Sequence, residues 1–99
     1  MSFEFFASLP QTVPLDLVRL ANSLCRQMPV ELIATELEHV SLRWKASSNE
    51  LEEIGLWHQS DTVTLAIHVG TGAQQDQLLE CVTREILQMT GVAVSFAEE

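Results

Sequence analysis

Positive charge is what this sequence has least of. Only 5 Lys and Arg residues stand against 14 Asp and Glu residues in a chain of 99, which gives a formal net charge of −9. A polyphosphate or an anionic lipid surface must be met by Lys and Arg side chains. The composition therefore disfavours nucleic acid and membrane surfaces as partners. It favours a protein partner with a basic surface, or serves only to keep the chain in solution.

Long apolar runs are missing as well, and cysteine is scarce. No apolar stretch approaches the roughly 20 residues that span a bilayer, and the first residues, MSFEFF, lack the basic start of a signal peptide. The two cysteines, Cys25 and Cys81, both fall inside predicted helices. A chain with two cysteines and no secretory signal is typical of a reducing compartment, so we expect a cytoplasmic protein.

Glycine is also infrequent, and its one cluster fails as a phosphate-binding loop. The segment Gly70–Gly72 follows an apolar strand, but the third glycine of a G-x-G-x-x-G pattern would fall at Gln75. No Lys follows as in a P-loop, and Asp76 in the first helical turn would repel a phosphate. We therefore predict a sharp strand-to-helix turn here, with Thr71 as a helix cap.

Patterns typical of catalysis or of metal binding do not stand out. The three histidines, His39, His58 and His68, have no helical i, i+4 spacing, and no cysteine lies near any of them in the sequence. The chain also lacks a nucleophile turn of the kind that serves a Ser, His and Asp arrangement. We expect a protein that is not an enzyme, with no catalytic residue, no metal and no cofactor.

Apolar residues, by contrast, are plentiful. They make up 46% of the chain, which is enough for one folded domain over residues 1–99. Hydrophobic periodicity predicts helices over 15–28 and 73–89, and strands over 2–8, 39–46, 51–58, 62–69 and 92–96. Residues 30–38 fit either a strand or a short helix. In the strand over 62–69, Val63, Leu65, Ile67 and Val69 are expected to share the core face.

This order of elements predicts an α+β fold, with two helices packed on one face of a mainly antiparallel sheet of four to five strands. A ferredoxin-like βαββαβ arrangement is the favoured topology. The other face of the sheet is expected to carry small and polar residues and to remain solvated.

Two features point to a binding surface. Acidic residues cluster in the middle third of the chain, and Trp57 is predicted to point away from the helices, together with Glu53. Tryptophan is enriched at interaction hot spots, although an outward Trp57 can also be covered by Arg43 or Lys45. The predicted partner-binding residues are Glu36, Glu38, Glu50, Glu53 and Trp57. The competing interpretation is a solvated edge that discourages aggregation.

The function that follows is binding of another protein, most specifically as a small inhibitor or immunity-type protein that blocks a basic partner. Acidic residues would steer association, and Trp57 would supply desolvated contact. The alternative is a ferredoxin-like regulatory or ligand-binding module that self-associates, as a homodimer, through its open sheet face. Thr64, Ala66, Ala93 and Ser95 would make that face flat enough to pack.

Overall fold

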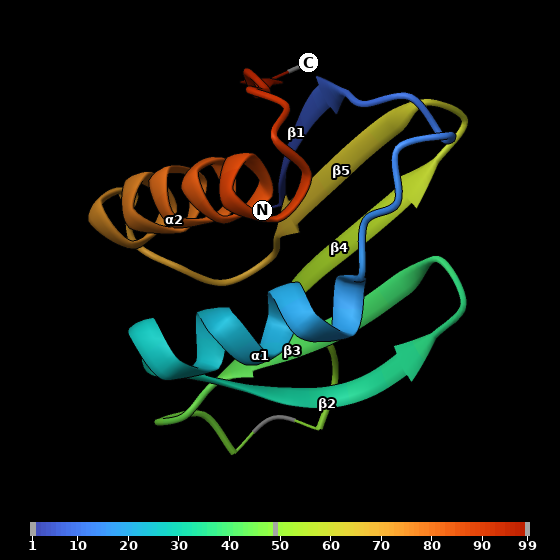
Figure 1. Ribbon diagram of the computed structural model, residues 1–99. Helices are drawn as coiled ribbons and strands as arrows, with labels where there is room; N and C mark the ends of the chain where they lie inside the picture. Colours follow the sequence, from blue (N-terminus) through green and yellow to red (C-terminus); the bar gives the residue numbers. More distant parts are fainter. Residues whose placement is uncertain (1, 49, 99) are drawn as a thin grey trace.

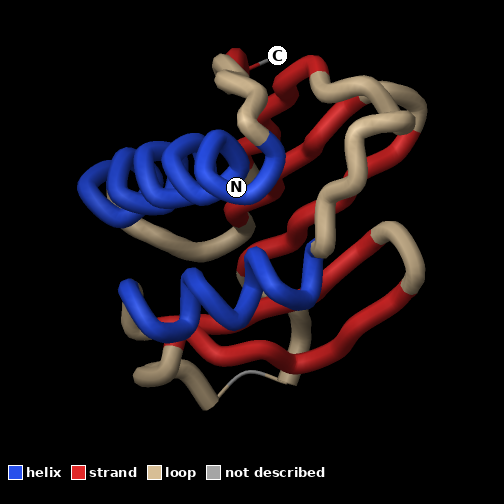
Figure 2. The backbone as a smooth tube through the Cα atoms, in the orientation of Figure 1, coloured by secondary structure: helices blue, strands red, loops and turns tan. Residues whose placement is uncertain are grey.

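The computed structural model describes residues 2–48 and 50–98, so that Asn49, in the turn expected over residues 47–50, lies outside the described residues. The elements follow one another as strand, helix, four strands, helix and strand (Figures 1 and 2). Their bounds are β1 (Phe3–Ser8), α1 (Leu17–Gln27), β2 (Val30–Glu36), β3 (His39–Trp44), β4 (Ile54–Gln59), β5 (Thr62–Ile67), α2 (Gly72–Thr90) and β6 (Ala97–Glu98).

The strands form one antiparallel sheet in the order β2-β3-β4-β5-β1-β6. Both helices lie against the same face of this sheet (Figure 1). The predicted α+β class, with two helices on an antiparallel sheet, is therefore confirmed. The prediction of four to five strands was wrong, because the sheet has six strands. The βαββαβ topology is not confirmed, since four consecutive strands separate the two helices.

Each helix begins at a capping side chain. The Asp16 carboxylate accepts the backbone N–H of Arg19 at 3.0 Å and starts α1. Thr71 and Gln74 form a reciprocal capping box at the start of α2, and Gly91, with φ of 77°, ends that helix. The prediction that residues 70–72 form a turn with Thr71 as a cap is thereby confirmed. None of the helices in the described residues is long and apolar enough to cross a membrane.

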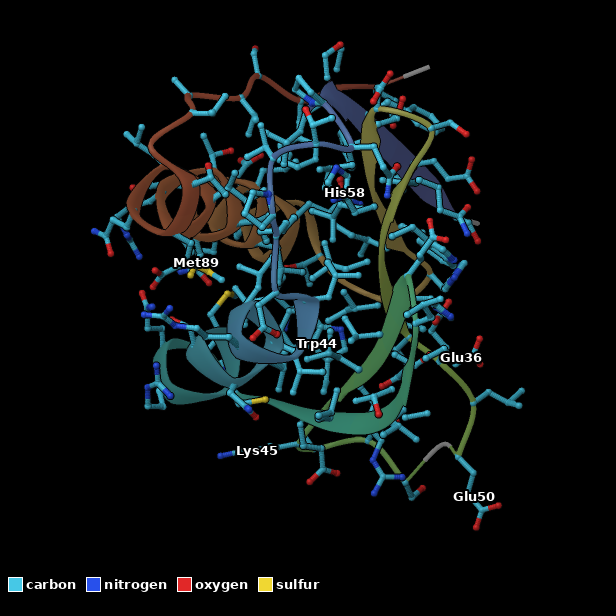
Figure 3. The ribbon with its side chains drawn as sticks, turned by 45° about the vertical axis from the view of Figure 1, so that its right-hand side comes forward. Glu36, Trp44, Lys45, Glu50, His58 and Met89 are labelled. Atoms are coloured by element: carbon cyan, nitrogen blue, oxygen red, sulfur yellow. The ribbon has the colours of Figure 1, made fainter. Side chains whose placement is uncertain are left out.

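The core lies between the helices and the sheet and forms one hydrophobic cluster. Leu65 on β5 is fully buried, as are the neighbouring inward residues of the central strands. Figure 3 shows Trp44 and His58 inside this layer, where His58 Nε2 lies 3.0 Å from the Leu9 carbonyl oxygen. A buried polar contact also joins the helices, because Glu85 accepts a hydrogen bond from Ser23 at 2.7 Å.

The structure settles one open segment and moves several predicted boundaries. Residues 30–36 form a strand, which resolves the ambiguous segment. Strand β4 begins only at Ile54, and β5 ends at Ile67, so that Val69 lies beyond it and is 47% exposed instead of sharing the core face. The prediction of a closing strand over 92–96 was wrong, because the strand that follows α2 in the described residues is 97–98, which pairs with β1. The segment 92–96 packs on the core without joining the sheet ladder.

Candidate functional site

The face of the sheet away from the helices carries polar and aromatic side chains. Strand alternation places Leu56 in the core and its neighbours Gly55 and Trp57 on this open face. The cross-strand register then fixes which residues lie beside them. One row across the face consists of Glu36, His39, Trp57, Thr64 and Phe6, and the next consists of Ala34, Ser41, Gly55, Ala66 and Glu4.

Glu53 is buried and does not lie on the open face. It is only 3% exposed, and its carboxylate accepts hydrogen bonds from the Trp44 backbone N–H and the Ser47 hydroxyl, both at 3.1 Å. The prediction that Glu53 points outward was therefore wrong. That prediction assumed the inward and outward alternation of a regular strand. Glu53 instead precedes β4, and its side chain folds back to hold the β3–β4 connection.

The neighbouring Glu52 is the centre of a hydrogen-bonded cluster on the open face. Its carboxylate lies 2.6 Å from His39 Nε2, 2.7 Å from the Ser41 hydroxyl and 3.2 Å from His68 Nε2. A carboxylate only accepts, so both histidines donate through Nε2. Burial alone would raise the pKa of Glu52, but the hydrogen bonds from Ser41, His39 and His68 outweigh burial and lower it.

Trp57 stands beside this cluster and is partly buried. Its indole stacks on the ring of His39, with the ring centroids 4.2 Å apart and the planes 5° from parallel. His39 thus covers Trp57, in place of the expected Arg43 or Lys45. Gly55 makes this arrangement possible, because a Cβ atom there would lie 2.4 Å from Trp57 Cη2 and 2.7 Å from Glu52 Oε2.

The open face is acidic. Four carboxylates share it with one guanidinium, which is a local balance of −3 with the histidines neutral. The guanidinium, that of Arg43, is held by Glu31 at 2.6 Å, so it neutralises a carboxylate of the same face. The four carboxylates are those of Glu4, Glu31, Glu36 and Glu52.

The remaining predicted site residues lie around this face. Glu36 is 72% exposed and 3.8 Å from His39 Nδ1, and Glu38 follows it in the β2–β3 turn and is half-buried. Glu50 is exposed in the β3–β4 connection. Figure 3 shows Glu36 and Glu50 both projecting on the side of the molecule away from the helices. Of the four predicted glutamates, Glu36 lies in the same row of the open face as Trp57, whereas Glu50 lies in the connection at the other end of β4.

The cluster also contains a relay with the order of a nucleophile, a base and an acid. The Ser2 hydroxyl lies 2.7 Å from His68 Nδ1, while His68 Nε2 donates to Glu52. The same carboxylate also accepts hydrogen bonds from His39 and Ser41, so it is not dedicated to His68 as the acid of such a relay is to its base. Within the described residues, no group of three or more His, Cys, Asp and Glu side chains could hold a metal ion.

A hollow of about 390 Å³ lies between the two helices, away from the open face. It is lined by polar residues of both helices together with Cys81, Met28 and Pro29. Burial raises the pKa of the Cys81 thiol, which keeps it protonated and unreactive at neutral pH. The hollow accordingly offers less chemistry than the open face.

Sequence reasoning missed Glu52, His39 and His68 as a group. The three residues are separated along the chain, and only the register of β3, β4 and β5 brings them together. One local feature of the sequence could have indicated the cluster. A glycine inside a strand pattern often marks a place where another group approaches the backbone closely. Gly55 is such a residue, two positions before Trp57 and three after Glu52.

Comparison of this chain with protein-family models, curated proteins and solved structures gives no match.

Proposed function

We propose that this protein is a non-catalytic binding domain whose open sheet face associates with a basic partner protein. The observation that carries the proposal is that four carboxylates and the aromatic side chain of Trp57 share the face of the sheet that no helix covers. In its most specific form the protein blocks that partner, as a small inhibitor or immunity-type protein does. Free thiols at Cys25 and Cys81 suit the cytoplasm as its place of action.

Charge and contact have separate roles in this proposal. The acidic face attracts a cationic surface from a distance and raises the association rate. Trp57 then provides the apolar area that slows dissociation. Because the steering charges are exposed, salt screens them beyond about 8–10 Å.

Self-association through the same face is less well supported. Two copies would bring their carboxylates together, and like charges across an interface repel. Ala93 and Ser95, which were expected to flatten the face, lie in the segment 92–96 outside the sheet. Ala66 is already 99% covered by its own chain.

The test compares two double charge reversals by surface-immobilised binding kinetics, with an octa-arginine peptide as the cationic probe. Glu4→Lys with Glu36→Lys reverses two exposed carboxylates of the open face, and Asp76→Lys with Glu80→Lys makes the same change of charge on α2. We expect the first pair to lower the on-rate about tenfold at low salt and the second to lower it much less. Equal losses from both pairs, or salt-independent binding, would show that the open face is not the docking surface.

A further inference from the structure

The cluster on the open face has a more specific chemical character than its charge alone. Glu52 Oε2 and Trp57 Cη2 both lie close to the position of a Gly55 Cβ, at 2.7 and 2.4 Å. They are therefore no more than 5.1 Å apart, the sum of these two distances. A carboxylate and an indole ring so close together can contact a single ligand group at the same time.

Each of the two groups keeps capacity for a ligand. An ionised carboxylate has about four acceptor positions, and the cluster uses three of those on Glu52 through Ser41, His39 and His68. The Glu52 side chain remains 21% exposed. The lowered pKa keeps it ionised at neutral pH.

His39 stacks on one face of the indole. It lies on β3, directly opposite Trp57 in the register, and the two ring planes are 5° from parallel. On the other side of Trp57 in the sheet lies β5, where Thr64 is its register partner. Beyond Thr64 lies Phe6 on β1, so a second aromatic side chain flanks the same strip of the sheet.

We propose that this corner of the open face is a binding site for an arginine side chain of the partner. The guanidinium plane would continue the His39–Trp57 stack on the indole face opposite His39, while its edge N–H groups donate to Glu52. Planarity and a fork of donors distinguish arginine from lysine, whose ammonium is a compact and strongly hydrated charge. Stacking on tryptophan and a charge-assisted hydrogen bond therefore reinforce each other only for arginine.

This inference rests on the proposed function, and the experiment separates the two. Binding of octa-arginine and octa-lysine, which carry the same side-chain charge, is measured by fluorescence anisotropy of labelled peptides at several salt concentrations. We expect the protein to bind octa-arginine about tenfold more tightly than octa-lysine. Both affinities should fall with salt, because both peptides share the long-range attraction.

Three variants assign the preference to the site. Trp57→Ala should abolish the tenfold preference and leave both peptides with the weaker affinity. Gly55→Ala should do the same, because the new Cβ displaces the indole and the carboxylate together. Gln59→Ala, on the same strand and the same face, should retain the preference. Circular dichroism checks that each variant is folded, and Trp57→Leu replaces any variant that is not.

The outcomes differ for the two proposals. Equal binding of the two peptides by the unmodified protein would overturn the arginine site while leaving a basic partner in place. Binding of neither peptide would overturn both. A preference that survives Trp57→Ala or Trp57→Leu would show that arginine is recognised elsewhere on the protein.

Discussion

Replacing Glu53 tests whether one buried carboxylate holds the β3–β4 connection in place. In Glu53→Ala the Trp44 backbone N–H loses its acceptor in a buried position. The half-buried Ser47 hydroxyl loses its bond too, but it can turn to water. A hydrogen bond to a charged group contributes about 1.5–3 kcal/mol, and a buried unpaired donor costs about 1–3 kcal/mol. We expect the free energy of unfolding to fall by about 2–3 kcal/mol.

Urea denaturation followed by far-UV circular dichroism measures this change, with an unchanged slope m as the sign of a two-state comparison. The corresponding shift in Tm is about 10–20 °C downward for a chain of this size. Glu53→Gln retains an oxygen acceptor and should lose only about 1 kcal/mol. Glu50→Ala removes a charge of the same sign from the exposed part of the same connection and should change stability by less than about 0.5 kcal/mol. A loss from Glu53→Ala as small as that control would refute the structural role.

Two further predictions concern the core and the cluster on the open face. Leu65→Ala should lower the free energy of unfolding by about 2–5 kcal/mol in the same assay, because Leu65 is fully buried in the central strand β5. A loss below about 0.5 kcal/mol would contradict its place in the core. The folded-state pKa of Glu52 is below its ordinary value of 4.5, so its stabilising effect is present above that pH and is lost as the pH falls through the lower, folded value. Between about pH 5 and pH 3 the unmodified protein should therefore lose stability more steeply than Glu52→Gln, and parallel pH profiles for the two proteins would contradict this.

The sequence was sufficient for elements that depend on local patterns. Alternation along 62–67 predicted that Val63, Leu65 and Ile67 face the core, and Thr71 marked the start of α2. The sequence-based prediction was wrong where a tertiary contact overrides the local pattern. Residues 92–96 alternate like a strand, yet only residues 97–98 pair with β1. Val92 and Phe96 bury apolar surface by packing on the core, without forming hydrogen bonds of the sheet.

The candidate site was predictable only in part, for a similar reason. Trp57 was placed on the correct face because it lies within a regular strand. Glu52 and Glu53 differ in role by one position just before that strand, where no periodicity applies. The register that joins His39 and His68 to Glu52 depends on pairings between strands, and a single sequence does not specify these.

The position of β1 in the sheet has a consequence for the order in which the chain folds. Its register joins Phe3 to Ile67 and Ser8 to Thr62, whereas β2 to β5 pair with their neighbours along the chain. Local hairpins form faster than pairings that must close a long loop. We expect the four-stranded meander to assemble first and β1 to dock on β5 afterwards, although β1 is synthesised before any of its partners. Until residues 62–67 have left the ribosome, Phe3, Phe5 and Phe6 have no strand to pair with, which makes this the stage at which the nascent chain is most exposed to aggregation or chaperone capture.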